Sequence, residues 1–426
     1  MNILHINNFH YFRGGSESVY FNTAKLLEEH GHHSVFFSTQ HPENIPCEMD
    51  KYFMPYVDFS ARHSIIDQLK IAGRVIYSLE AKKRLTRLIE EYPVDVAHLH
   101  NIYHVFSPSI LHVLKKKKIP VVMSLHDYKM VCGSYTLLRR HPIYGTVCEE
   151  CSGGKYYKAV KNKCVKNSFA KSLLTAVEMY LHHKVLDIYK NVDIFICTSK
   201  FAKSKLEEMG FKKNFFYLPN FIDTKKLSAF NFAAGKIEKS KAVLYIGRHV
   251  PEKGLWTLLD AAGILYKKNK TIEIKLSGEG PFTEILKAKV KEENIGNVRF
   301  LGFLKYEDLC CEIQNSAAVV LPSECHDNNP ISVIESFAMS VPVIGARMGG
   351  IPELVRDYET GLTFEAGNAQ DLSEKIEYVI DNPDKAADWG KMAKKLVEEK
   401  LGAEKYYADL MEIYQLASKK AVSYAS

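Results

Sequence analysis

The chain has 426 residues, of which 46% are hydrophobic and 25% are charged, and this length predicts two domains of about 200 residues each rather than a single core. The composition is ordinary for a soluble globular protein, and no apolar run approaches the roughly 18 residues of a membrane-spanning helix. Because Met1 leads directly into a short buried strand, without a basic leader or a cleavage site, we expect a cytoplasmic protein.

The net charge of +7 lies in the first half of the chain. Residues 1–200 hold 26 Lys and Arg against 18 Asp and Glu, whereas the remainder holds 31 against 32. The basic patches at residues 82–84, 115–118 and 155–171 suit an anionic membrane at the inner face of the cell, or a substrate carried on a lipid phosphate. The alternative is that these basic residues are simply the solvent-exposed faces of helices. Nucleic acid is not expected, because no helix-turn-helix, RRM or repeat signature accompanies the patches.

The first elements follow a strand, helix, strand order. Residues 3–6 predict a buried strand, and the next loop leads into a helix over residues 16–30 with Ser16 as the expected N-cap. Gly14 and Gly15 precede this helix and let the backbone approach a ligand closely, although paired glycines are also common in plain turns. With a second strand at residues 35–37, the order is that of a nucleotide-binding Rossmann half.

Histidines follow the next two predicted strands. Residues 66–92 predict one or two long basic helices, and the strand at residues 94–99 runs into His100. A helix over residues 107–117, capped by Ser107, precedes a strand at residues 120–125 that is followed directly by His126 and Asp127. Because the carboxyl ends of parallel strands line the crevice of such a sheet, these side chains are candidate site residues.

Four cysteines then stand close together. Cys148 and Cys151 form a C-x-x-C, with Cys132 lying 16 residues before it and Cys164 lying 13 residues after it. Structural disulfides are rare in a cytoplasmic protein, so this grouping suggests a structural zinc site. A redox or iron–sulfur site and four unconnected thiols are the alternatives.

The rest of the first half predicts a long helix over residues 168–189, a strand at 192–197 and a helix opening at Ser199. The apolar face of the long helix is expected to be buried and consists of Leu173, Ala176, Val177, Tyr180, Leu181 and Val185. Residues 221–240 have no clear period and are the expected linker between the domains.

A second domain begins with a strand at residues 242–246. Gly247 and Arg248 follow that strand, and Lys253 opens a helix, so two positive charges can reach into the crevice where a diphosphate would need them. A surface Arg and Lys beside a turn is the plain alternative. Gly302 and Phe303 end a strand at residues 298–301, whose edge is the expected place for a nucleobase.

The stretch at residues 317–344 predicts a strand, a polar loop, a helix over residues 332–340 and another strand. The open N-terminus of this helix can receive a phosphate. Asp327 and Glu335 stand here with seven residues between them, so one carboxylate can hold sugar hydroxyls and the other ribose hydroxyls. Acids near a helix N-terminus are also common because they complement the helix dipole.

This stretch resembles glycosyltransferase family 4, whose pattern is an acid, seven residues and a glutamate, then a small-residue helix and a G-x-P-V-I strand. The chain departs from that pattern in two places, with Asp327 in place of the usual Glu and Ser340 in place of Gly. The matching residues are Pro322, Ser323, Asn328, Asn329, Pro330, Glu335, Ser336, Ala338, Pro342, Val343 and Ile344.

The resemblance implies an α/β chain of the GT-B fold, in which two Rossmann-like, doubly wound parallel-sheet domains face a cleft. Residues 1–220 would bind the acceptor, with a cysteine-bearing insertion at 132–164 as in a subgroup of the family, and residues 241–402 would bind the nucleotide sugar. The terminal helix at 403–426 would cross back to the first domain.

The resemblance also implies retaining transfer of a hexose-type sugar from a UDP- or GDP-sugar to a glycan or lipid-linked acceptor, in cell-surface polysaccharide synthesis. No metal or other cofactor is expected in catalysis. A sugar-nucleotide 2-epimerase, a glycan phosphorylase and a catalytically silent sugar-nucleotide-binding protein are the rivals. The implied catalytic residues are His126, Arg248, Lys253 and Asp327, the donor-binding residues are Gly14, Gly15, Gly247, Gly302, Phe303, Asn328, Asn329, Pro330, Ile331, Ser332 and Glu335, and the acceptor-side residues are His100 and Asp127.

Overall fold

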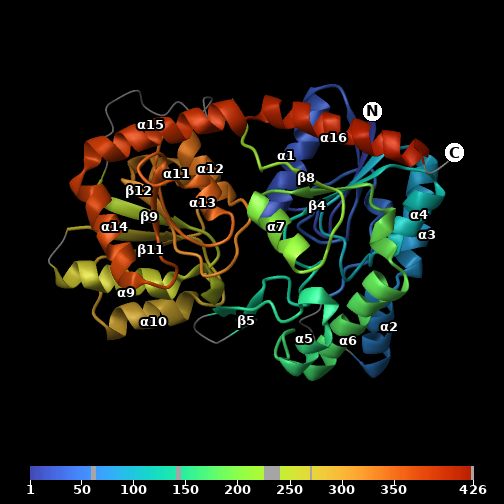
Figure 1. Cartoon of the computed structure of the whole chain (residues 1–426), viewed down its shortest axis with the longest axis horizontal. Coiled ribbons are helices and arrows are strands. Elements are labelled where there is room, and N and C mark those ends of the chain that lie inside the picture. The colour runs from blue at the N-terminus through green and yellow to red at the C-terminus, as the bar shows by residue number, and fades with distance from the viewer. Residues whose placement is uncertain (59–63, 141–144, 225–239, 269–270, 424–426) are drawn as a thin grey trace.

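A computed structural model describes residues 1–58, 64–140, 145–224, 240–268 and 271–423. Its two large sheets have six strands each, and every strand pair in them is parallel. Helices cover these sheets, and the two α/β domains stand side by side (Figure 1). The predicted architecture of two doubly wound parallel-sheet domains is therefore confirmed.

The first sheet has the order β2-β1-β3-β4-β7-β8. Its central strands are buried along almost their whole length, because a parallel sheet covered by helices is buried on both faces. The strands are β1 (Asn2–Ile6), β2 (His33–Phe37), β3 (Val96–Leu99), β4 (Val121–Leu125), β7 (Ile194–Cys197) and β8 (Phe215–Tyr217). The helices of this domain are α1 (Gly15–Glu29), η1 (Asp50–Tyr52), α2 (Ile65–Ile76), α3 (Leu79–Glu91), α4 (Ile110–Lys116) and α7 (Lys200–Glu208).

The second sheet has the order β11-β10-β9-β12-β13-β14. This is the strand order of a dinucleotide-binding domain. Ligands of such domains bind at the point where the strand order reverses, which here lies between β9 and β12. The strands are β9 (Ala242–Ile246), β10 (Glu273–Ser277), β11 (Val298–Gly302), β12 (Ala318–Leu321), β13 (Val343–Ala346) and β14 (Gly361–Phe364). The helices are η5 (Pro251–Lys253), α9 (Leu255–Lys267), α10 (Thr283–Glu292), α11 (Tyr306–Asn315), α12 (Ile331–Ala338), α13 (Ile351–Leu354), α14 (Ala369–Asp381) and α15 (Pro383–Lys400).

Between β4 and β7 the chain forms a separate lobe with its own small core, built on Cys151, Tyr156, Ala159, Ala176 and Met179. A fully buried ion pair joins this lobe to the loop after β4, with 2.8 Å between Lys129 Nζ and Glu178 Oε2. The elements of the lobe are a hairpin of β5 (Leu138–Arg140) and β6 (Gly145–Val147), then η2 (Ser152–Gly154), α5 (Tyr157–Lys161), α6 (Phe169–Tyr180), η3 (Leu181–Val185) and η4 (Ile188–Asn191).

The terminal helix α16 (Ala403–Ser423) follows α15 and lies along the first domain (Figure 1). Its Tyr406 hydroxyl lies 3.1 Å from Thr23 Oγ1 of α1, and its Tyr414 hydroxyl lies 2.8 Å from His98 Nδ1 of β3. Of the expected linker, residues 225–239 lie outside the described part of the chain. Among the helices that the structure describes, none has the length and apolar character needed to cross a membrane.

Three predictions about helices were wrong, and the first two concern where a helix begins. Gly14 rather than Ser16 is the N-cap of α1, and Ser16 donates instead to Glu17. Helix α4 begins at Ile110, because Ser107 adopts a left-handed backbone (φ 51°) and its hydroxyl accepts the Ser78 N–H at 3.0 Å.

The long helix predicted over residues 168–189 stops at Tyr180 and continues as a wider π turn, and its apolar residues do not form a single buried face. Leu173, Val177 and Val185 are exposed, whereas Ser172 and Glu178 are buried. The polar side chains point inward because Glu178 pairs with the buried Lys129.

Candidate functional site

The loop that carries Asp327 lies where the two domains meet. Asn220 of the first domain donates its backbone N–H to Asn329 Oδ1 at 2.9 Å and its side-chain amide to the Asn329 carbonyl at 2.7 Å. Asn328 donates its side-chain amide to the carbonyl oxygen of His126 at 3.2 Å. The predicted donor-binding loop and the predicted catalytic histidine are therefore neighbours where the two domains meet.

A carboxylate of the second domain also reaches the first. Glu353 accepts the backbone N–H groups of Lys200 at 3.0 Å and Phe201 at 2.7 Å, which are the first residues of α7. An acid at a helix N-terminus pairs with unsatisfied amides and with the positive end of the helix dipole. This contact joins the start of α7 in the first domain to α13 in the second.

The helix that follows the loop begins at Pro330, and no side chain caps it. The backbone amides of its first residues, Ile331 and Ser332, therefore have no capping side chain, which leaves the helix N-terminus open to an anion. Gly15 of the first domain lies directly opposite, since a Cβ added to it would lie 3.6 Å from Ile331 Cδ1. Gly15 therefore lies against the start of α12, whereas the close approach of Gly14 and Gly15 to a ligand stays a prediction.

Lys253 and Asp327 form an ion pair, with Lys253 Nζ lying 2.6 Å from Asp327 Oδ1 and 2.8 Å from Oδ2. The buried hydroxyl of Ser323 donates to the same carboxylate at 2.5 Å. Burial works to lower the pKa of Lys253, but the Asp327 carboxylate outweighs it and holds that pKa above its usual value. Lys253 is thus a permanent cation in the cleft.

Gly254 explains how Lys253 comes so close to the loop. Gly254 has a left-handed backbone (φ 66°), and a Cβ on it would lie 1.7 Å from the Pro322 carbonyl oxygen. Only glycine fits between η5 and the end of β12. The K-G pair in the sequence therefore has a packing reason that spacing alone did not reveal.

Arg248 lies at the carboxyl end of β9, beside the same crevice. Its side chain is exposed and has no hydrogen-bond or ion-pair partner among the described residues, so the guanidinium is available to a ligand. Gly247 precedes it and packs tightly, because a Cβ on Gly278 would lie 2.0 Å from the Gly247 carbonyl oxygen. At the end of β11, Gly302 has a left-handed backbone (φ 68°), and the Phe303 side chain that follows is 81% exposed.

Glu335 stands one turn into α12, and no hydrogen bond or ion pair joins its carboxylate to another described residue. Burial alone raises the pKa of Glu335 from 4.5 to about 7. Burial raises the pKa values of Tyr306 and Cys310, and the charge of Glu335 adds to this rise, which places these α11 side chains near Glu335. A carboxylate that is desolvated and unpaired in the free protein is suited to accept hydroxyl groups of a ligand.

His126 is the first of three stacked histidines, and its carbonyl accepts the hydrogen bond from Asn328 of the second domain. Its Nε2 lies 2.9 Å from His100 Nδ1, and the two rings are stacked. His100 stacks in turn on His98, whose Nδ1 and Nε2 lie 2.8 Å from the hydroxyls of Tyr414 and Ser124. Burial lowers the pKa of His126 to about 4 and keeps the ring neutral at pH 7.

His100 was expected on the acceptor side, and the structure buries its side chain fully inside the first domain, in contact with His126. Asp127, which follows His126 in the chain, was also expected on the acceptor side. It accepts the Lys129 N–H at 2.8 Å, and burial raises the pKa of Asp127 to about 6.

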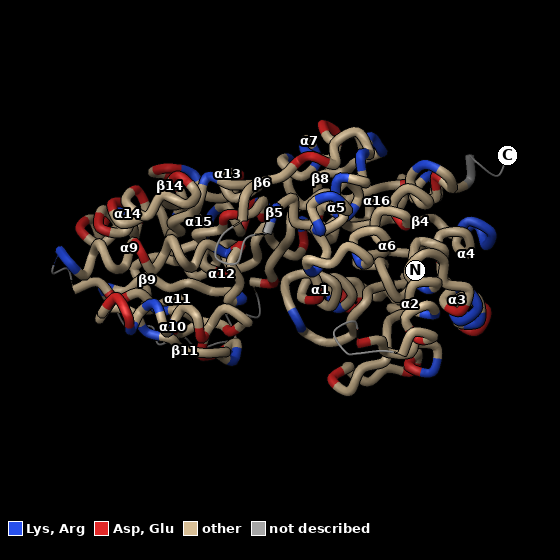
Figure 2. The backbone as a smooth tube through the Cα atoms, turned by 90° about the horizontal axis from the view of Figure 1, so that it is seen from below, with Lys and Arg blue, Asp and Glu red and all other residues tan. Residues whose placement is uncertain are grey.

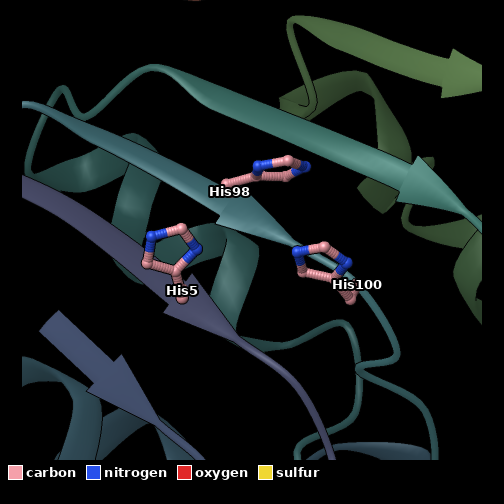
Figure 3. A group of neighbouring side chains, drawn as sticks. All are labelled: His5, His98 and His100. Carbon is pink, nitrogen blue, oxygen red and sulfur yellow. The ribbon is translucent and has the colours of Figure 1, made fainter. Parts of the chain in front are cut away.

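His5, His98 and His100 lie together on β1 and at the end of β3 (Figure 3). Each offers a ring nitrogen within 4.8 Å of the others, the only such set of three potential metal ligands in the described part of the chain. Both nitrogens of His98 already have hydroxyl partners, and no carboxylate belongs to the set. A divalent cation here would leave its charge uncompensated in a buried site, which is costly.

The four cysteines of the lobe are brought together without forming a closed cage. Burial raises the pKa of Cys151 to about 12, and Cys132, Cys164 and Cys148 each contribute to this rise, so the thiols are neighbours. All four are free of disulfides. The Gly133 N–H points at the Cys151 sulfur and lowers its pKa in part.

Several contacts of the site were not predicted from the sequence. Ser323, Asn220, Glu353 and Tyr306 touch or support the predicted residues from separate segments. Ser323 was named only as part of the family pattern, without this contact, and Asn220 directly follows Pro219, which is the signal that could have pointed to it.

Two protein-family models match this chain, one over each domain. The family model described as Glycosyltransferase Family 4 matches residues 13–226, and the model described as Glycosyl transferases group 1 matches residues 228–396. An uncharacterized glycosyltransferase of Methanocaldococcus jannaschii is 26% identical over 358 residues, which cover 83% of this chain and 84% of that protein.

Solved structures of similar fold cover nearly the whole chain. Sucrose-phosphate synthase from Thermosynechococcus elongatus superposes with a TM-score of 0.68 at 18% identity, covering 97% of this chain and 98% of that one. An Anabaena protein solved in complex with UDP and glucose superposes with a TM-score of 0.65 at 17% identity, covering 97% and 99%. At these identities the likeness establishes the fold.

Proposed function

The chain belongs to glycosyltransferase family 4 and is a glycosyltransferase that uses a nucleotide-sugar donor, and from this premise we propose that it moves a hexose-type sugar to a glycan or lipid-linked acceptor with retention of the anomeric configuration. The donor is a UDP- or GDP-sugar. UDP has the more direct support, because the Anabaena structure of the same fold contains UDP and glucose.

The observation that carries the proposal is the pairing of Lys253 with Asp327 at the open N-terminus of α12. Departure of the nucleoside diphosphate is the demanding step, because negative charge grows on its β-phosphate. Arg248, Lys253 and the amides of Ile331 and Ser332 would stabilise that charge, so catalysis requires no metal ion. Asp327 already accepts from Lys253 and Ser323, which makes it a poor covalent nucleophile and favours front-face displacement.

A donor panel tests this function. The purified chain is incubated with UDP- and GDP-sugars, with and without lipid extract, and released nucleoside diphosphate and the product anomer are measured. Transfer releases the diphosphate and gives a product of unchanged anomeric configuration. Conversion of one sugar nucleotide into another would identify an epimerase instead, and binding without turnover would identify a silent sugar-nucleotide-binding protein.

Asp327→Asn should lower transfer about tenfold while leaving the affinity for free UDP or GDP nearly unchanged, because the partner of this acid is the sugar ring rather than the nucleotide. Binding is measured by calorimetry and transfer by diphosphate release. Asp327→Glu is the matched control, since the longer acid matches the family pattern and should keep part of the transfer. Equal weakening of free nucleotide and sugar nucleotide by Asp327→Asn would reassign the residue.

The proposed place of action is the inner face of the cell membrane, in synthesis of a cell-surface polysaccharide. The basic first half of the chain supports this location, because a lipid-linked acceptor carries phosphate and lies in an anionic surface.

For the four grouped thiols we propose a structural zinc ion, which would draw Cys132, Cys148, Cys151 and Cys164 into a tetrahedral site. Protein purified without added metal should contain close to one zinc per chain, and joint Cys148→Ser and Cys151→Ser substitution should remove it and lower the unfolding temperature. Cys311→Ser, at an exposed thiol on α11, is the control that should keep the metal. An iron chromophore without zinc would establish the cluster alternative, and no metal at all would leave four unconnected thiols.

A further inference from the structure

Helix α6 exposes a stripe of apolar side chains and buries polar ones, which is the reverse of an ordinary surface helix. Phe169, Leu173 and Val177 follow one another at a spacing of four and are 58%, 44% and 46% exposed. Its buried face carries Ser172, Thr175 and Glu178 beside Ala176 and Met179. A surface helix of a globular domain ordinarily turns its apolar stripe to the core. The exposed stripe of α6 therefore lacks a partner within the described chain.

Helix α2 adds a second exposed apolar group to the same region. Ile65, Ile66 and Leu69 are 78%, 67% and 69% exposed. The helices are neighbours at the lower edge of the first domain (Figure 1), and His182, in the turn that continues α6, bonds the Ile76 carbonyl at the end of α2 at 2.7 Å. We name the six side chains Ile65, Ile66, Leu69, Phe169, Leu173 and Val177 the α2–α6 face.

Positive charge borders this face. Residues 155–171 contain six lysines and no acidic residue. Lys161, Lys163 and Lys171 are exposed, and α5 carries blue segments beside α6 in the view from below (Figure 2). The one acid of α2, Asp67, lies 3.7 Å from Lys70. The residue 115–118 patch belongs to α4 and the turn after it, away from this face (Figure 1).

We propose that the α2–α6 face docks the protein on an anionic lipid bilayer. The apolar side chains would enter the interface between headgroups and acyl chains while the flanking lysines stay at the phosphates, which is how interfacial helices bind membranes. A second copy of the chain fits this face less well, because two lysine-rich borders would repel each other. The inference deepens the proposed function and rests on it for the lipid-linked acceptor.

Sedimentation with vesicles tests the surface without donor or acceptor. Wild-type protein should bind phosphatidylcholine vesicles that contain phosphatidylglycerol and should bind pure phosphatidylcholine weakly. Joint Leu69→Asp and Leu173→Asp substitution should lower partitioning on the order of tenfold, since burial of apolar area supplies much of the affinity. Lys163→Glu with Lys171→Glu should lower it by roughly fivefold per lysine.

Matched controls place the same changes elsewhere. Ile285→Asp on α10, where the side chain is 48% exposed, and Lys116→Glu with Lys394→Glu, at exposed lysines of α4 and α15, should bind vesicles as wild type does. All variants are checked for donor-dependent release of nucleoside diphosphate in detergent, so a failure of docking is distinguished from a failure of transfer. Wild-type vesicle binding by the α2–α6 variants, or a change in their oligomeric state instead, would overturn the proposal.

Discussion

Lys253→Ala is expected to lower the turnover of sugar transfer by about 10² or more, with a smaller loss of donor affinity. The Lys253 ammonium lies 2.6 Å from Asp327 in the free protein and stands at the crevice where the leaving diphosphate gains charge. A cation that meets the leaving group chiefly as its charge grows contributes more to the transition state than to donor binding. Steady-state diphosphate release over a range of donor concentrations separates kcat from KM.

The same substitution leaves Asp327 without its ammonium partner, so stability must be measured beside activity. Lys289→Ala is the matched control, because Lys289 is a buried lysine of the same domain whose Nζ lies 2.7 Å from Asp260, outside the cleft. The control should lose stability but keep its turnover. A folded Lys253→Ala protein with wild-type turnover would remove Lys253 from the catalytic site.

Glu335→Gln is expected to weaken the binding of free nucleotide by roughly 10- to 100-fold at pH 8, since a hydrogen bond to a charged group is worth roughly 1.5–3 kcal/mol. The variant should also be more stable than wild type at that pH. Burial raises the pKa of Glu335 from 4.5 to about 7, so between these values the folded chain holds a proton that the unfolded chain releases. Stability of the wild type therefore falls as the pH rises from about 4.5 through 7.

The stabilisation by Gln is expected to reach at most about 3 kcal/mol at pH 8, to fall below about 1 kcal/mol at pH 5 and to vanish only below about pH 4, at about 1.4 kcal/mol per pKa unit. Wild-type nucleotide affinity should rise through pH 7 relative to the variant, and this comparison cancels the titration of the nucleotide's own phosphates. Denaturant unfolding and calorimetry at pH 5 and pH 8 give both quantities. Glu307→Gln on α11, at an exposed carboxylate, should change neither. Unaltered nucleotide binding by Glu335→Gln at pH 8 would exclude it from the ribose site.

Short segments of sequence were sufficient to predict the fold class, and they also supplied most of the candidate site residues, whose roles stay predictions. The apolar runs at β9, β12 and β13 identify buried parallel strands by composition alone, because such strands are covered on both faces. The spacing of Asp327 and Glu335 likewise lies within one loop and the helix after it. These features depend on residues near one another in the chain, and periodicity and turn chemistry report on that range.

Contacts between distant segments were decided only by the tertiary structure. Lys253 and Asp327 are 74 residues apart, and nothing in either string shows that they pair across Gly254 and Pro322. His100 stands after a strand as His126 does, yet His100 is fully buried whereas His126 is partly exposed and accepts a hydrogen bond from Asn328 of the second domain, and only the packing of distant segments decides this difference.

Helix α6 shows the same limit for surfaces. Its sequence specifies an apolar stripe, and a period of 3.6 residues says which side chains share a face but not whether that face meets the core or the solvent. The buried Lys129–Glu178 pair turns the polar side inward and leaves Leu173 and Val177 outside. The sequence by itself thus determined that a helix with apolar side chains begins near residue 168, whereas the tertiary structure decided where the helix ends and which side is buried, because burial depends on a charge partner 49 residues away.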